Sequence, residues 1–279
     1  MQVGILTAPF RNETMDTVVG FASEAGFDAL EIDVRPGAKP LNVVDCSADE
    51  AKRRLAQVRG AGLQVSSLAC YVNISDADEV KRAEARDILR KAVDMAAANA
   101  VGIVCCTAGL PPEGMTREQT IEQVAGPFFN EICAYAGERG VKLALENWFA
   151  TNIMHLEQWG LMFATVPAEN LGLNFDPSHL YWQGIDHLYA VEKFASRIFH
   201  THGKDTEVIA HRLRVIGNQA GRGWWRYVIP GWGEIDWGVY IARLRDNGYN
   251  GVISIEHEDR AFGREEGFIK GLTHLRLFV

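Results

Sequence analysis

Eight short runs of β-branched and apolar residues, each followed by a longer amphipathic segment, constrain the fold of this chain more than any other feature. The runs lie at residues 3–7, 28–34, 63–69, 101–107, 141–147, 171–176, 197–203 and 251–257. Nearly continuous apolar character is typical of strands buried on both faces, as in a parallel sheet. Strands that alternate with helices in this way form either a closed barrel or a doubly wound open sheet.

The segments between the runs repeat apolar residues at helical spacing and predict helices. They cover residues 12–26, 48–62, 76–99, 117–138, 155–167, 185–195, 237–247 and 264–278. No GxGxxG follows the first run, which disfavours a dinucleotide-binding open sheet. The chain of 279 residues is close to the roughly 250 that a (β/α)8 barrel needs. The sequence therefore predicts an α/β fold, a single (β/α)8 TIM barrel over residues 1–279.

The longest irregular stretch of this predicted barrel spans about residues 206–234, between the seventh strand and the helix that follows it. Loops that follow barrel strands lie on the face where such barrels carry their chemistry. We therefore expect this loop to border the functional site.

Charge and composition restrict the partners and the compartment. The 36 acidic and 28 basic residues give a net charge of −8, which disfavours a nucleic-acid partner because nucleic-acid binding depends on Lys and Arg. No signal peptide or long apolar stretch is visible, so no membrane association is expected. The five cysteines fit no zinc or CxxC pattern, and we interpret them as free thiols of a reducing compartment. These features predict a cytoplasmic protein.

Metal-capable side chains end four consecutive predicted strands. Glu146 ends the fifth strand, Asp176 the sixth, either His200 or His202 the seventh, and Glu256 the eighth. A carboxylate buried at a strand end is costly unless it is paired or coordinated. Taken singly, each of these residues is more often an ion-pair partner or a helix cap, but four successive strand ends favour a shared divalent cation. Three carboxylates and one imidazole suit Mn²⁺, Mg²⁺, Co²⁺ or Zn²⁺.

Five segments in this order resemble the xylose-isomerase-like barrel superfamily, and within it the sugar isomerases and epimerases. They are LALEN (143–147), FDPSH (175–179), HTHGKD (200–205), PGWGEIDW (230–237) and GYNGVISIEHED (248–259). The resemblance covers essentially the whole chain. It implies that the metal ligands are Glu146, Asp176, His202 and Glu256, because the family's histidine ligand directly precedes GKD.

The resemblance also implies residues that bind the substrate. His179 matches a family position that contacts substrate, Lys204 and Asp205 match a pair beside the metal histidine, and Arg226 resembles an arginine that contacts substrate oxygens. Trp148 follows the fifth strand and is expected to stack on a sugar ring. An oligomer contact or a local core is an equal alternative for Trp148 and for the Trp224–Trp225 pair.

The implied activity is a metal-dependent isomerisation or epimerisation of a sugar, keto-sugar or keto-inositol. The metal would polarise a carbonyl and stabilise an enediolate, while Glu146 and Glu256 remove and return a proton. Mn²⁺ is the expected ion, and a homodimer or homotetramer is the assembly that the resemblance implies.

Three alternatives remain open at this point. A dehydratase or decarboxylase acting on a keto-sugar would need the same metal and the same intermediate. The related apurinic endonucleases need further histidines, but the third and fourth predicted strands end at Cys70-Tyr71 and at Thr107-Ala108. A barrel that only binds its ligand is disfavoured by the two glutamates that can act as acid and base.

Overall fold

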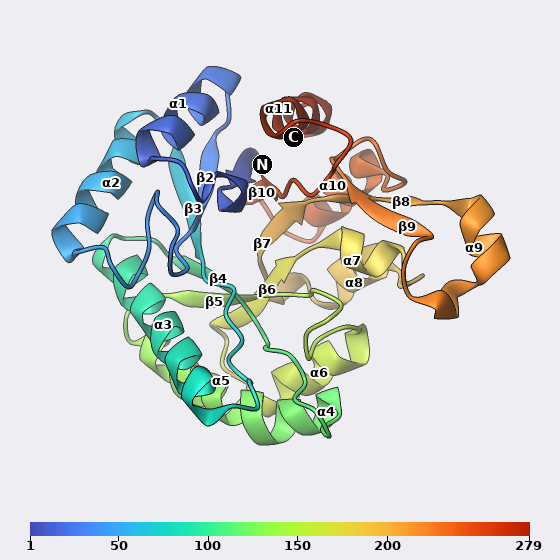
Figure 1. Cartoon of the computed structure of the whole chain (residues 1–279), viewed down its shortest axis with the longest axis horizontal. Helices are drawn as coiled ribbons and strands as arrows, with labels where there is room; N and C mark the ends of the chain where they lie inside the picture. Colours follow the sequence, from blue (N-terminus) through green and yellow to red (C-terminus); the bar gives the residue numbers. More distant parts are fainter.

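Eight parallel strands close into a barrel in the order β1-β10-β7-β6-β5-β4-β3-β2 (Figure 1). The computed structural model describes all residues from Met1 to Val279. The barrel strands are β1 (Gln2–Leu6), β2 (Ala29–Asp33), β3 (Gln64–Ala69), β4 (Ile103–Thr107), β5 (Lys142–Glu146), β6 (Leu171–Phe175), β7 (Ile198–Gly203) and β10 (Val252–Ile255). Each strand overlaps one of the eight predicted runs, and the predicted (β/α)8 TIM barrel is confirmed.

Helices form a ring outside the barrel. They are α1 (Met15–Ala25), α2 (Ala48–Gly60), α3 (Glu79–Ala98), α4 (Arg117–Thr120), α5 (Gly126–Gly137), α6 (Leu156–Thr165), α8 (His187–Lys193), α10 (Trp237–Asp246) and α11 (Arg264–Leu275). Side-chain caps start several of them: Thr14, Ser47, Asp78 and Asp236 each accept a hydrogen bond from the first turn of the helix that follows. The short 3-10 turns η1 (Ala8–Phe10) and η3 (Ala195–Arg197) lie in the connections.

The predicted helix 117–138 contains a local irregularity. A π-helical turn, η2 (Ile121–Ala125), joins α4 to α5. Pro127, the second residue after this turn, has no N–H to donate to the carbonyl of Gln123. The helix therefore widens at this point and continues without a break.

The segment between β7 and α10 is ordered rather than irregular. Strands β8 (Asp205–Val208) and β9 (Trp225–Val228) form a two-stranded antiparallel sheet, which we call the β8–β9 hairpin. The helix α9 (Ala210–Ile216) and the turn η4 (Asn218–Ala220) lie at its tip, which extends away from the barrel in Figure 1. The short helix α7 (Pro177–Tyr181) follows β6, and the Asp176 side chain caps it by accepting from the Ser178 N–H.

The interior of the barrel is polar near its C-terminal end. Glu31 of β2 and His202 of β7 lie on strands that are not neighbours in the sheet, yet their side chains are 3.1 Å apart. Both side chains therefore point into the barrel, where both are fully buried. No helix in the structure combines the length and the apolar character that crossing a bilayer requires.

Candidate active site

The four predicted metal ligands lie together at the C-terminal rim of the barrel. Glu146 ends β5, Asp176 directly follows β6, His202 is near the end of β7, and Glu256 directly follows β10. One ligand atom from each lies within 4.8 Å of those of the other three. The carboxylate oxygens of Glu256, Glu146 and Asp176 are 3.1, 3.7 and 3.7 Å from His202 Nδ1. We call these four residues the ligand quartet.

Two atoms of the ligand quartet lack a hydrogen-bond partner. Asp176 Oδ2 and His202 Nδ1 are buried and make no hydrogen bond of good geometry within the protein, although Lys204 Nζ lies 3.1 Å from Asp176 Oδ2 as an ion pair. A buried polar atom left in this state costs about 1–3 kcal/mol. A cation held between these two atoms and the glutamate oxygens would satisfy both of them, so the donor set fits a bound metal ion.

The side chain of Lys204 is buried beside the ligand quartet and carries a positive charge at neutral pH. Its Nζ lies 2.6 Å from Glu256 Oε2, 3.1 Å from Asp176 Oδ2 and 3.5 Å from Glu258 Oε2. Burial lowers the pKa of Lys204, but these carboxylates and Glu146 raise it well above its usual value. Four carboxylates thus surround one ammonium group, and a divalent ion would leave a single excess negative charge.

Two carboxylates of the ligand quartet, Glu146 and Asp176, have lowered pKa values. Burial acts to raise the pKa of Glu146, but hydrogen bonds with His179 and His202 hold it well below its usual range. Burial acts in the same direction on Asp176, whose pKa is lowered by the charge of Lys204 and by His179 and His202. Ionised carboxylates are the form that binds a cation.

Glu31, which sequence reasoning missed, fixes the orientation of His202. Glu31 Oε2 lies 3.1 Å from His202 Nε2, and Glu31 Oε1 accepts a hydrogen bond of 2.7 Å from the hydroxyl of Tyr71. Burial acts to raise the pKa of Glu31, but His202, with His200 and Tyr71, lowers it to about 2. Glu31 is thus placed to hold a proton of His202 on Nε2, so that Nδ1 is the ring nitrogen that faces the other three residues of the ligand quartet.

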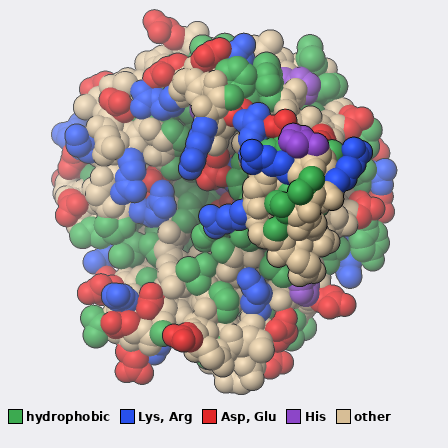
Figure 2. Space-filling model, turned by 45° about the vertical axis from the view of Figure 1, so that its right-hand side comes forward, with side chains coloured by type: hydrophobic (Ala, Val, Ile, Leu, Met, Phe, Trp, Pro, Cys, Tyr) green, Lys and Arg blue, Asp and Glu red, His purple; other side chains and the backbone are tan.

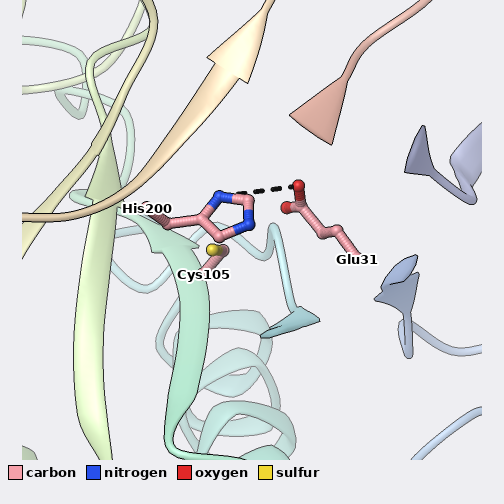
Figure 3. Close-up of side chains that lie close together, drawn as sticks. All are labelled: Glu31, Cys105 and His200. Atoms are coloured by element: carbon pink, nitrogen blue, oxygen red, sulfur yellow. Dashed lines mark ion pairs between the residues drawn. The ribbon is translucent and has the colours of Figure 1, made fainter. Parts of the chain in front are cut away.

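A second group of metal-capable side chains, Glu31, Cys105 and His200, lies deeper in the barrel (Figure 3). Every polar atom of His200 and Glu31 already has a partner: His200 Nδ1 lies 2.9 Å from Asn174 Oδ1, and His200 Nε2 lies 3.2 Å from Ser66 Oγ. Burial lowers the pKa of His200 to about 4, so it is neutral, and burial raises the pKa of the Cys105 thiol well above its usual value. A protonated thiol is a poor metal ligand. This deeper group therefore has a structural role, since Glu31 contacts His202 of the ligand quartet.

Glu31→Gln is expected to weaken metal binding about 10–100-fold, because His202 loses the carboxylate that fixes its tautomer. Titration of the ion-free protein with Mn²⁺ measures the affinity. Asp33→Asn is the matched control on the same strand, since the Asp33 carboxylate pairs with Arg35 instead of His202. Equal affinities in wild type and Glu31→Gln would contradict this role.

A pocket of about 370 Å³ opens above the ligand quartet. Its lining includes Glu146, Glu256, His179, Lys204, Trp148, Glu258, Tyr71 and Arg35. Arg35 also escaped sequence reasoning: its guanidinium is held by two hydrogen bonds, 2.8 and 2.9 Å long, to the buried carboxylate of Asp33. Of the predicted substrate-binding residues, His179, Lys204 and Trp148 thus line this pocket.

His179, another predicted substrate contact, also lies beside the ligand quartet. Its Nε2 lies 3.3 Å from Glu146 Oε1 and 3.5 Å from Asp176 Oδ2. Its Nδ1 shares a hydrogen bond of 2.5 Å with the hydroxyl of Tyr227, which belongs to the β8–β9 hairpin. The β8–β9 hairpin therefore reaches the ligand quartet indirectly, because His179 lies between Tyr227 and the quartet.

Asp205 and Arg226 lie elsewhere and bind protein groups. Asp205 Oδ1 accepts from the N–H groups of Thr206 and Ile235, and Asp205 Oδ2 accepts from the Gly231 N–H and from Trp237 Nε1. Arg226 pairs with Glu207 and with Asp259. Neither side chain lines the pocket above the ligand quartet, so the predicted substrate contacts there have no geometric support. Motif position alone could not reveal these partners.

Asp205→Asn is expected to lower the free energy of unfolding by about 1–3 kcal/mol. Each carboxylate oxygen of Asp205 accepts from two donors. In either orientation of the new side-chain amide, its NH₂ group would replace one of these oxygens and face two donors without an acceptor. Urea denaturation measures the change. Asp236→Asn is the control, because Asn and Asp cap a helix equally well, and an equal loss in both variants would argue against the role given to Asp205.

The model of the Xylose isomerase-like TIM barrel family matches residues 19–278. The chain belongs to this family. One curated relative, the uncharacterized protein YfiH of Bacillus subtilis, is 27% identical over 99% of this chain and 98% of its own length. Inosose dehydratase of Clostridium perfringens is 29% identical over 46% of this chain and 44% of its own length.

Solved structures share the fold at low identity. The zinc-bound IolI protein superposes with a TM-score of 0.78 at 21% identity, covering 100% of this chain and 99% of its own. The probable 3-DHS dehydratase AsbF of Bacillus anthracis gives 0.75 at 19% identity, covering 99% of each chain. The 3-keto-D-glucoside 4-epimerase YcjR of E. coli gives 0.73 at 18% identity, covering 99% of each chain. The three neighbours thus include an epimerase, a protein described as a probable dehydratase and a zinc-bound protein.

Proposed function

We propose that this protein is a divalent-metal-dependent isomerase or epimerase of a keto-sugar or keto-inositol. The observation that carries the proposal is the ligand quartet, in which Asp176 Oδ2 and His202 Nδ1 are buried without hydrogen-bond partners beneath a pocket of about 370 Å³. Pockets of this size accommodate small molecules. We propose Mn²⁺ as the native ion, a cytoplasmic enzyme and a homodimer or homotetramer as its assembly.

The metal would be held by Glu146, Asp176, His202 and Glu256, and when bound it supplies a positive charge that polarises a substrate carbonyl. Glu146 and Glu256 project from β5 and β10, which are separated by β6 and β7 in the barrel. A substrate in the pocket therefore has one carboxylate on each side. One glutamate removes the proton next to the carbonyl and the other returns a proton, which inverts or moves that centre.

Two neighbours of the ligand quartet assist this transfer. Lys204 Nζ is 2.6 Å from Glu256 Oε2, so a positive charge lies against the carboxylate that would transfer the proton. His179 Nε2 is 3.3 Å from Glu146 Oε1. His179 is thus placed to hold a substrate hydroxyl beside Glu146.

A dehydratase is the second candidate, favoured by the similarity of about half of the chain to inosose dehydratase. Elimination of water begins with the same proton removal and then needs an acid at the leaving hydroxyl. His179, which bridges Glu146 and the Tyr227 hydroxyl, is the side chain placed for that task. The two candidates therefore differ in what happens after one shared step.

Incubation with a panel of keto-sugars and keto-inositols in D₂O, with each of Mn²⁺, Mg²⁺, Co²⁺ and Zn²⁺, tests the proposal. Isomerisation or epimerisation keeps the molecular formula and introduces one solvent deuterium, whereas dehydration removes one water. Chelation of the metal is expected to stop either reaction. Absence of both turnover and deuterium exchange across the whole panel would overturn the proposed function.

A further inference from the structure

A second cleft of about 480 Å³ opens beside the pocket above the ligand quartet. We call it the outer cleft. It is lined by Trp148, Phe149, Arg222, Trp225, Arg226, Tyr227, Glu258 and Arg260. Trp148 and Glu258 line both spaces, so the two are continuous. The β8–β9 hairpin forms one wall of the outer cleft, and the segments that follow β5 and β10 form the others.

The outer cleft is basic although the chain as a whole is acidic. It holds three arginines and one carboxylate, Glu258, whereas the net charge of the protein is −8. Figure 2 shows basic side chains around a hollow in the face that it draws, with acidic side chains inside that hollow. A basic cleft on an acidic protein concentrates anions and steers them inward.

Two of the three arginines are free to bind a ligand. Arg226 is paired with Glu207 and Asp259, and this pairing ties the hairpin to the segment after β10. Arg222 and Arg260 are exposed and form no ion pair within the protein. Glu258 does not neutralise the charges of Arg222 and Arg260, because its single carboxylate lies 3.5 Å from a third cation, Lys204.

Stacked aromatic rings hold the outer cleft open. Trp225 of the hairpin stacks on Trp182 with ring centroids 4.3 Å apart and planes 7° from parallel. Phe149 meets both rings edge-on, at 5.8 Å from Trp225 and 5.2 Å from Trp182. This packing fixes the hairpin against the segments after β5 and β6, so the wall that carries Arg222 is set before any ligand arrives.

We propose that the outer cleft is a subsite for an anionic substituent of the substrate, a carboxylate or a phosphate, bound by Arg222 and Arg260. The inference rests on the proposed function, because the keto-sugar part of the same molecule occupies the pocket above the ligand quartet. Guanidinium groups pair with carboxylates and phosphates through two parallel hydrogen bonds, which gives both charge and direction to the contact. Trp148, half-exposed at the junction, lies between the two parts of the substrate.

Binding of three probes at fixed ionic strength tests this subsite without requiring turnover. D-glucose 6-phosphate carries a phosphate, D-glucuronate carries a carboxylate, and D-glucose is the neutral reference. Quenching of tryptophan fluorescence measures the affinity, since tryptophans line the outer cleft. Wild type is expected to bind at least one of the two anions about tenfold more tightly than D-glucose, which corresponds to one guanidinium–anion contact of about 1.4 kcal/mol. The preferred anion distinguishes a phosphate from a carboxylate.

Arg222→Ala/Arg260→Ala is expected to remove this preference, whereas Arg245→Ala, an exposed arginine of α10 without ion pairs, is expected to keep it. The same comparison made in Asp176→Asn/His202→Ala separates the two proposals, because the anion preference does not need the metal. An anion preference that survives Arg222→Ala/Arg260→Ala, or equal binding of all three probes to wild type, would overturn the subsite. Failure of the metal chemistry with an intact, arginine-dependent preference would overturn only the proposed function.

Discussion

Asp176→Asn/His202→Ala is expected to lose the divalent ion that the wild-type protein retains, from about one ion per chain to almost none. The two substitutions remove the atoms that are buried without hydrogen-bond partners, Asp176 Oδ2 and His202 Nδ1. They leave two glutamates, which form an incomplete site that binds divalent ions weakly. Elemental analysis after incubation with Mn²⁺, Mg²⁺, Co²⁺ or Zn²⁺ and removal of free ion measures the content.

Glu258→Gln is the matched control for this experiment. Glu258 is a carboxylate of the same rim, 3.5 Å from Lys204, but it lies outside the ligand quartet. We expect this variant to retain the ion. Wild-type protein that holds none of the four ions after incubation would contradict both the metal site and the proposed chemistry. Circular dichroism of each variant shows whether the barrel is folded, so that loss of metal is not confused with unfolding.

The ligand quartet could be predicted because barrel topology converts order along the chain into proximity in space. Glu146, Asp176, His202 and Glu256 each stand at the C-terminal end of a strand, and parallel strands of a barrel bring those ends to one rim. The eight strands themselves were visible as apolar runs because both of their faces are largely buried. The fold and three of the four residues therefore followed from position, whereas the choice of His202 over His200 came from the resemblance to the family.

The residues around the ligand quartet depend on contacts across the barrel, which position along a strand does not reveal. Glu31 stands in the run DALEIDV, where an acidic residue gives no sign that it meets His202 on a strand far away in the sheet. Arg35 and Tyr71 come from the first half of the chain, which carries none of the segments that resemble the family. The β8–β9 hairpin has strands of only four residues separated by a helix, too short for a readable alternation.

Motif position also did not show which of two adjacent residues would line the pocket. Asp205 stands beside Lys204, and only Lys204 reaches the pocket above the ligand quartet. Neighbouring residues of an extended strand point in opposite directions. The carboxylate of Asp205 is therefore directed toward the turn at Gly231 and Ile235, where a Cβ on Gly233 would come within 2.2 Å of it. This side chain shapes the wall of the site, and a substrate contact would require it to leave four hydrogen bonds.

Glu256→Gln is expected to lower kcat about 10²–10⁴-fold on the substrate that the panel identifies, which is the usual loss when a general base is removed. Glutamine keeps the size of the side chain and one oxygen for the metal, but it cannot accept a proton. Elemental analysis of the same preparation is needed, because Glu256 Oε2 lies 3.1 Å from His202 Nδ1 and the substitution also touches the metal site. A proton-transfer role for Glu256 requires that kcat fall by a larger factor than the metal content.

Deuterium exchange separates a proton-transfer role of Glu256 from a purely structural one. If Glu146 and Glu256 act on opposite sides of the substrate, Glu256→Gln blocks proton removal on one side and leaves Glu146 able to exchange a proton on the other. One of the two epimers should then still take up solvent deuterium without being converted into its partner, and Glu146→Gln should show the reverse preference. Loss of exchange from both epimers in both variants, with the metal retained, would place the proton transfer on another group. His179, 3.3 Å from Glu146, would then be the next side chain to replace.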